Sequence, residues 1–138
     1  MNYWLMKSEP STWSWDDQIR KGAKGEGWDG VRNYQASNNM KSMSVGDLCF
    51  FYHSVKERDV VGIVKVIKSY HPDPTDKTSR FGMVRVAKYK SLKKRVNLDQ
   101  IKNDTRLKHL ALVRQSRLSV MPIDKKSWTI ICNLGGIK

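Results

Sequence analysis

The chain of 138 residues, 39% of them hydrophobic, predicts one domain spanning 1–138 that buries about two-thirds of the surface of its unfolded chain. Four prolines and nine glycines exclude collagen-like and broadly disordered chains, and two cysteines without a CxxC pair exclude a disulfide scaffold and a cysteine-clustered zinc site. The formal net charge of +13, from 26 basic and 13 acidic residues, predicts an anionic partner.

Hydrophobic periodicity and capping signals predict short strands and helices in chain order. The predicted strands are Tyr3–Met6, Leu48–His53, Val60–Tyr70, Phe81–Tyr89 and Leu118–Met121. The predicted helices are Trp15–Lys21, Arg32–Met43, Leu98–Lys102 and Lys125–Asn133, with Ser14 and Asp124 as N-caps. His71–Arg80 is expected to be a loop, because its two prolines cannot donate hydrogen bonds to a sheet.

The order of these elements favours one fold class. Strands and helices do not alternate as they do in a parallel sheet. We therefore expect an α+β fold, in which a small mixed β-barrel or curled sheet is flanked by short helices.

No apolar run is long enough to cross a membrane. The longest runs, Leu48 to Tyr52 and Val60 to Val64, have five residues each. The short apolar stretch near the amino terminus is followed by the charged residues Lys7 and Glu9, so it is too short for the core of a signal peptide. We therefore expect a soluble, cytoplasmic monomer without a membrane partner.

The positive charge is concentrated in the second half of the chain. Residues 1–69 carry ten basic and eight acidic groups, a balance of +2, whereas residues 70–138 carry sixteen and five, a balance of +11. The run from Lys88 to Arg95 alone holds five basic residues. This distribution predicts binding to nucleic acid. A generally basic surface is the alternative, with Lys88 to Arg95 as a solvated strand edge.

The sequence contains no pattern typical of a catalytic or metal site. His53, His71 and His109 are scattered, without HxH or HExxH spacing, and no glycine-rich phosphate loop is present. Cys49 lies within an apolar strand, where a buried, inert thiol is expected. We therefore predict no catalytic residue, no metal and no cofactor.

Tryptophans cluster in the nearly neutral half, at Trp4, Trp13, Trp15 and Trp28. A base pocket needs flat apolar walls and a few polar groups that read the edge of the base. Trp4 and Trp15 are expected in the core. Trp28 lies in a turn-rich stretch with less core to join, so we expect it to form a pocket wall, with a core position as the alternative.

Six sequence blocks resemble the EVE domain family. They are Tyr3–Pro10, Trp28–Gln35, Gly46–Ser54, Val61–Val64, His71–Thr75 and Ser116–Ile123, which together run through nearly the whole chain. The resemblance implies a PUA-like β-barrel with a concave pocket. It also implies binding of modified bases in DNA or RNA, with 5-methylcytosine derivatives as the leading candidates.

A looser similarity to the YTH domain, which binds N6-methyladenosine, places the pocket. It implies that Lys7 and Ser8 lie at the pocket edge and that Trp28 forms a wall, with Tyr52 as a further cage aromatic. Asp29 stands where the YTH motif has small residues.

The candidate site residues form two sets. The base-binding set is Lys7, Ser8, Trp28, Asp29, Asn33, Tyr52, Ser116 and Ser119. The phosphate-binding set is Arg117, Lys88, Lys90, Lys93, Lys94 and Arg95. The expected function is non-enzymatic reading of a modified base in DNA or RNA. The alternatives are an RNA-binding or protein-interaction module without such selectivity, and a nucleic-acid-modifying enzyme with Asp29 as a catalytic acid.

Overall fold

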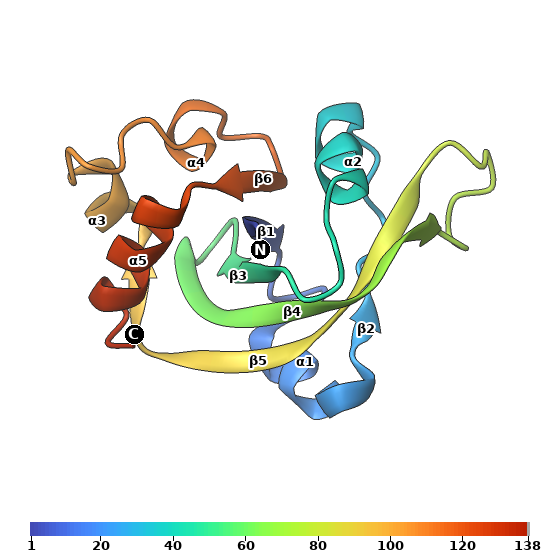
Figure 1. Ribbon diagram of the computed structural model, residues 1–138, viewed down its shortest axis with the longest axis horizontal. Coiled ribbons are helices and arrows are strands. Elements are labelled where there is room, and N and C mark those ends of the chain that lie inside the picture. The colour runs from blue at the N-terminus through green and yellow to red at the C-terminus, as the bar shows by residue number, and fades with distance from the viewer. Residues whose placement is uncertain (138) are drawn as a thin grey trace.

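The computed structural model describes residues 1–137, which form a mixed six-stranded sheet surrounded by short helices (Figure 1). The strands are β1 (Tyr3–Ser8), β2 (Glu26–Gly27), β3 (Leu48–His53), β4 (Asp59–Pro72), β5 (Gly82–Asn97) and β6 (Val120–Ile123). Their spatial order is β2-β5-β4-β3-β1-β6. Only β1 and β3 run parallel; the other neighbouring strands of the described sheet are antiparallel.

The α-helices of residues 1–137 begin at side-chain caps, except the one that follows Leu110. They are α1 (Trp15–Lys21), α2 (Tyr34–Lys41), α3 (Leu98–Lys102), α4 (Ala111–Arg114) and α5 (Lys125–Leu134), with a 3₁₀ turn, η1, at Gly22–Lys24. Ser14 and Asp17 form a reciprocal capping box, and Asp124 accepts a hydrogen bond from the Ser127 backbone N–H, which confirms both predicted caps. None of the helices in residues 1–137 is long and apolar enough to cross a membrane.

Three predicted elements have the observed bounds, and the others differ from the structure. Trp15–Lys21, Leu48–His53 and Leu98–Lys102 have the predicted bounds. β1 extends to Ser8, α2 is shorter than the predicted Arg32–Met43, and α5 ends at Leu134. β4 extends to Pro72, so the first two residues of the predicted loop, His71 and Pro72, are paired with β5. β5 continues beyond Tyr89 to Asn97, because the residues from Lys88 onward pair with the apolar half of β4. β6 begins at Val120, two residues later than predicted, where it can pair with β1.

The predicted α+β class is confirmed, whereas closure into a barrel is not observed. Bulges shift the register of β4 against β5 at several points, and the two long strands curve beneath β1 and β3 (Figure 1). Within residues 1–137, however, β2 and β6 remain the edges of the sheet. Closure would require these two strands to pair, and they have only two and four residues.

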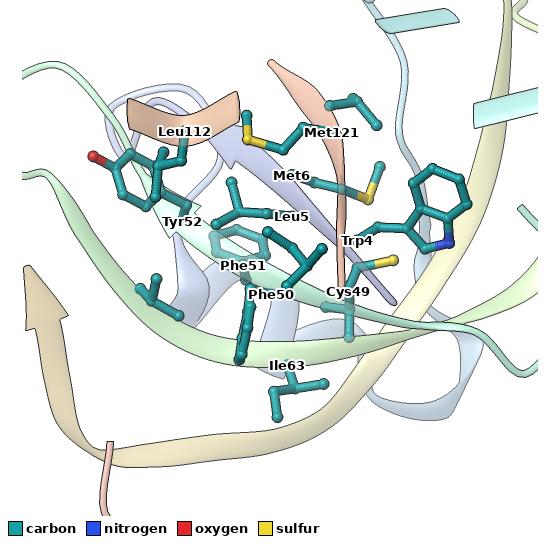
Figure 2. Packing of buried hydrophobic residues seen from close by; sticks show 14 of the residues in the cluster. Trp4, Leu5, Met6, Cys49, Phe50, Phe51, Tyr52, Ile63, Leu112 and Met121 are labelled. Atoms are coloured by element: carbon teal, nitrogen blue, oxygen red, sulfur yellow. The ribbon is translucent and has the colours of Figure 1, made fainter. Parts of the chain in front are cut away.

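The core lies on both faces of the central strands. Leu5 and Met6 of β1 pack with Phe50 and Phe51 of β3, all fully buried (Figure 2). The predicted core positions of Trp4 and Trp15 are confirmed, with 5% and 7% of their surface exposed. Trp15 lies directly over Gly62 of β4, where an added Cβ would come within 2.2 Å of the ring. The close approach of α1 to the sheet therefore depends on a residue without a side chain.

Candidate functional site

A first hollow, of about 360 Å³, opens between the end of β1, the turn before α1 and the segment around β2. It is lined by Lys7, Ser8, Glu9, Thr12, Trp13, Glu26, Gly27, Trp28 and Asp29. We call it the tryptophan hollow.

Trp13 is held by the turn that precedes α1. Its backbone N–H donates to the Glu9 carbonyl at 2.9 Å, and its carbonyl accepts from the Ser8 hydroxyl at 2.5 Å. The indole Nε1 donates to Gln18 Oε1 at 2.9 Å. Backbone and ring are therefore both anchored, although the side chain is only half-buried.

Trp28 belongs to the core and lines the tryptophan hollow at the same time. It is 8% exposed, and its ring meets Phe51 edge-on, with centroids 5.4 Å apart and planes at 85°. Its backbone N–H donates to the Val84 carbonyl at 2.8 Å. The expectation that this ring has little core to join was wrong, because β3 and β5 reach it across the sheet. Its role as the wall of a base pocket stays a prediction.

The loop after Trp28 is clamped by Asp73, whose side chain is fully buried. The carboxylate accepts from the backbone N–H of Gly30 at 2.9 Å, from Arg32 Nη1 at 3.1 Å and from the Thr75 N–H and hydroxyl at 2.8 and 2.7 Å. Burial alone would raise the pKa of Asp73, but these hydrogen bonds hold it below its ordinary value. The segment His71–Thr75 thus fixes the loop that carries Asp29.

The tryptophan hollow is acidic. Glu9, Glu26 and Asp29 line it, against the single cation Lys7. Burial, followed by the negative charges of Asp73 and Glu26, raises the pKa of Asp29. Flat apolar walls beside carboxylate acceptors suit the edge of a planar ligand that carries an amino group, and they disfavour a phosphate.

A second hollow, of about 610 Å³, has the opposite charge. It is lined by Lys7, Tyr52, Ser54, Val55, Arg58, Leu98, Lys102, Leu112, Val113, Ser116, Arg117 and Ser119. These residues come from the ends of β1 and β3, the loop before β4, α3, α4 and the segment before β6. Its lining therefore holds four cations and, within residues 1–137, no carboxylate. We call it the basic hollow.

Lys7 lines both hollows. Its ammonium group donates to the Ser116 carbonyl at 2.9 Å and lies 5.8 Å from the centroid of the Tyr52 ring. Burial lowers the pKa of Lys7 and raises the pKa of Tyr52 to about 12. The Tyr52 ring lies beside Leu112, and its hydroxyl points away from the labelled core side chains (Figure 2).

The structure divides the predicted base-binding residues between these hollows. Lys7, Ser8, Trp28 and Asp29 line the tryptophan hollow, as the sequence grouped them. The remaining candidates except Asn33 line the basic hollow, namely Tyr52, Ser116 and Ser119, together with the predicted phosphate ligand Arg117.

Asn33 lies outside both hollows. Its side-chain oxygen caps α2 by accepting from the Ala36 N–H at 2.9 Å. It lines a third hollow, of about 320 Å³, whose walls include Arg114, Ser116 and Arg117.

The basic run of β5 also lies apart from the tryptophan and basic hollows. Lys88, Lys90, Lys93 and Lys94 are exposed, and none of them lines either hollow. Arg95 forms ion pairs with Glu57 and, at 3.5 Å, with Asp59. Any anion at Arg95 must therefore compete with two carboxylates.

Sequence reasoning missed Trp13, Arg58 and Lys102 as candidate site residues. Trp13 stands immediately before the Ser14 cap, a position that lies outside the helix and frees the ring to line a hollow. For Arg58 and Lys102 the sequence carries no signal. They meet because the Leu98 N–H donates to the Arg58 carbonyl at 2.8 Å, which brings α3 to the loop before β4.

One cluster has the composition of a hydrolase triad but not its geometry. Asp124 Oδ1 and the Ser127 hydroxyl both contact the same nitrogen of His109, at 2.8 and 3.3 Å, whereas a triad places them on opposite ring nitrogens. Ser127 is 1% exposed, and the Asp124 carboxylate caps α5. The cluster therefore acts as a helix cap. No group of three metal-ligating side chains occurs in the described part of the chain.

Comparisons with known proteins agree with this architecture. The EVE domain family profile matches residues 2–134. Thymocyte nuclear protein 1 from Rattus norvegicus is 32% identical over 165 residues, covering 96% of this chain and 73% of that protein. The Mmi1 YTH domain, with 15% identity and a TM-score of 0.56 over 96% of this chain and 86% of that one, shares the fold alone.

Two solved structures are closely similar. A protein from Agrobacterium tumefaciens has a TM-score of 0.97 at 44% identity, covering 99% of this chain and 94% of that one. The human THYN1 protein in complex with 5-methylcytosine containing DNA has a TM-score of 0.91 at 29% identity, covering 100% and 99%. With a family profile that spans nearly its whole length, the chain belongs to the EVE domain family.

Proposed function

We propose that this EVE domain is a non-enzymatic reader that takes a modified base of DNA or RNA, such as a 5-methylcytosine derivative, into the tryptophan hollow. The observation that carries the proposal is the pairing of two tryptophan walls with three carboxylates in a hollow of about 360 Å³. The human relative bound to 5-methylcytosine containing DNA supports this choice of ligand.

The chemistry of the walls fits a cytosine ring. Stacking on Trp13 and Trp28 would contribute about 1–3 kcal/mol per base. A carboxylate of Asp29, Glu26 or Glu9 can accept from the exocyclic amine of cytosine, and Lys7 can donate to a ring acceptor. Burial of one methyl group adds only about 1 kcal/mol. Selectivity for the modified base is therefore expected to be modest.

Phosphate contacts must supply the rest of the affinity, because extruding a base costs a few kcal/mol. The second half of the chain carries a balance of +11, and Lys88, Lys90, Lys93 and Lys94 of β5 are exposed. Such contacts position a strand without reading its sequence.

Titration of matched oligonucleotides with and without 5-methylcytosine, at several salt concentrations, tests the proposal. We expect tighter binding of the modified strand and a log–log salt slope of about −3 to −6. Running DNA and RNA versions in parallel identifies the preferred strand. Equal binding of modified and unmodified strands would favour the module without base selectivity, and a flat salt response would exclude nucleic acid as the partner.

One observation bears on the enzyme alternative. The raised pKa of Asp29 is a property that general acids use. Prolonged incubation of the protein with the modified oligonucleotide, followed by mass analysis, separates the two functions. A reader leaves the mass unchanged, whereas a modifying enzyme alters or cleaves the strand.

A further inference from the structure

We infer that the basic hollow is a phosphate site, in which Lys7, Arg58, Lys102 and Arg117 hold the phosphodiester that flanks the base in the tryptophan hollow. The inference rests on the proposed function for the identity of the base. It adds a second site, with its own residues and its own ligand chemistry.

The first support is uncompensated charge. None of the four cations lies within 4.0 Å of a carboxylate of residues 1–137. The acidic residues nearest in sequence to Arg58 are Glu57 and Asp59, and Arg95 pairs with both. Four like charges around one hollow repel one another, and an anion at its centre relieves that repulsion.

The second support is the set of neutral donors between the cations. Ser54, Ser116 and Ser119 line the hollow, as does Tyr52. Because burial raises the pKa of Tyr52 to about 12, its hydroxyl keeps its proton at neutral pH. Hydroxyl groups and basic side chains are the groups that proteins use to bind phosphate oxygens.

The third support is continuity between hollows of different chemistry. Lys7 lines both the tryptophan hollow and the basic hollow. Ser116 and Arg117 line both the basic hollow and the third hollow with Asn33 and Arg114. A nucleic-acid strand that follows this path can place a base in the acidic tryptophan hollow, which repels phosphate. It can then place the neighbouring phosphate in the basic hollow, which attracts it.

The basic hollow is also built from elements that lie at one end of the molecule. α3, α4 and the loop between β3 and β4 lie together on the left of Figure 1. The Lys7 ammonium is tied to the Ser116 carbonyl, 109 positions away in sequence, so the rim shared with the tryptophan hollow is fixed. The cations from the loop and from α3, Arg58 and Lys102, are themselves exposed.

A charge-matched pair of double variants tests the inference. Arg58→Gln with Lys102→Gln removes two cations from the basic hollow. Lys125→Gln with Lys126→Gln removes two exposed cations from the start of α5, and neither of these lines any of the three hollows. We expect the first variant to weaken oligonucleotide binding about tenfold and to flatten the salt slope by about two units. The control should change affinity less than about threefold. Equal losses in both variants would overturn the inference. Thermal unfolding should be unchanged in both, since all four side chains are exposed.

A second arm identifies the source of the phosphate. Methylphosphonate groups on either side of the modified cytosine remove the phosphate charge from the strand. They should weaken binding of the wild-type protein about tenfold and add little to the loss in the Arg58→Gln, Lys102→Gln variant. If free inorganic phosphate saturates the hollow and methylphosphonates have no effect, the site takes a free anion and the assignment to the strand is wrong.

The readouts separate this inference from the proposed function. If a variant binds more weakly but keeps its preference for the modified base, the loss is caused by the basic hollow and the base site is intact. If the wild-type protein has no such preference but the salt slopes of the two variants still differ as expected, the reader function fails and the phosphate site stands.

Discussion

The tryptophan hollow carries three carboxylates beside Lys7, whereas the basic hollow carries Lys7 with three further cations and, within residues 1–137, no carboxylate. The two regions share Lys7 and differ in the sign of the charge that surrounds a ligand. In a nucleotide, the base is a flat ring with polar edges and the phosphate is a charged group. Adjacent hollows of opposite charge therefore separate the binding of the base from the binding of the phosphate better than one pocket of mixed charge could.

The two regions also differ in their coupling to folding. Trp28 packs on Phe51, and the loop after it is tied to buried Asp73, so the walls of the tryptophan hollow are part of the core. Arg58, Lys102 and Arg117 are exposed at the basic hollow. Changes in the first region are expected to affect both stability and binding, and changes in the second to affect binding alone.

The largest expected effect is that of Trp28→Ala on stability. Truncating a ring that is 8% exposed should lower the free energy of unfolding by about 3–5 kcal/mol, measured by chemical denaturation. Trp28→Phe keeps an aromatic contact with Phe51 and should lose less. If Trp28→Ala has the same free energy of unfolding as the wild-type protein, the ring lines the hollow without stabilising the core.

Asp73→Asn should lower the free energy of unfolding by roughly 2–3 kcal/mol, because the charged acceptor of several hydrogen bonds is lost. The pKa of Asp73 is lowered in the folded protein, so its contribution is complete above the ordinary value of about 4 and disappears as the pH falls through the lowered value. Denaturation at a series of pH values should show the wild-type protein approaching the variant in acid. A constant difference would contradict the clamp.

Trp13→Ala should weaken binding of the modified strand by about 1–3 kcal/mol and leave the salt slope unchanged, because a stacking wall is removed without loss of charge. Because the Trp13 ring is only half-buried, its removal should lower the free energy of unfolding less than Trp28→Ala does. Binding curves at two salt concentrations measure both quantities. An equal loss for modified and unmodified strands would show that Trp13 stacks on the ring without contacting the added methyl group, and no loss for either strand would show that Trp13 does not contact the base.

Asp29→Asn should produce the smallest effect, a change in the pH dependence of binding. The raised pKa of Asp29 means that protonation begins at a pH above its ordinary value of about 4, and a protonated carboxyl accepts poorly from the amine of cytosine. Wild-type affinity should therefore fall on acidification, and the variant should respond less. Identical pH profiles would assign the acceptor role to Glu26 or Glu9.

Much of the local structure could be predicted because its causes are local. The Ser14 cap, the apolar run Leu48–His53 and the Asp124 cap each act over a few residues, and each element begins where predicted. β5 was predicted too short because a strand as basic as Lys88–Arg95 is stabilised by its partner, the apolar half of β4, and not by its own composition.

The candidate site was predictable in part for the same reason. Two short sequence motifs supply four of the predicted base-binding residues, and these line one hollow. They are Lys7 and Ser8 in the first motif and Trp28 and Asp29 in the second. Asn33 lies outside the tryptophan and basic hollows, and its side-chain oxygen accepts a hydrogen bond from the Ala36 N–H. An asparagine before a helix can act as a cap or contact a base, so its role in base binding stays a prediction.

The sequence by itself determined the family, the α+β class, the excess of positive charge in the second half and the short segments that carry the tryptophans. Only the tertiary structure decided that the sheet of residues 1–137 stays open, that Trp28 joins the core, and that Arg58 and Lys102 meet Lys7 and Arg117 around one hollow. Composition and periodicity record what each residue prefers within its own turn or strand. The electrostatic environment of a hollow is instead set by side chains from distant segments, and their meeting depends on packing between elements.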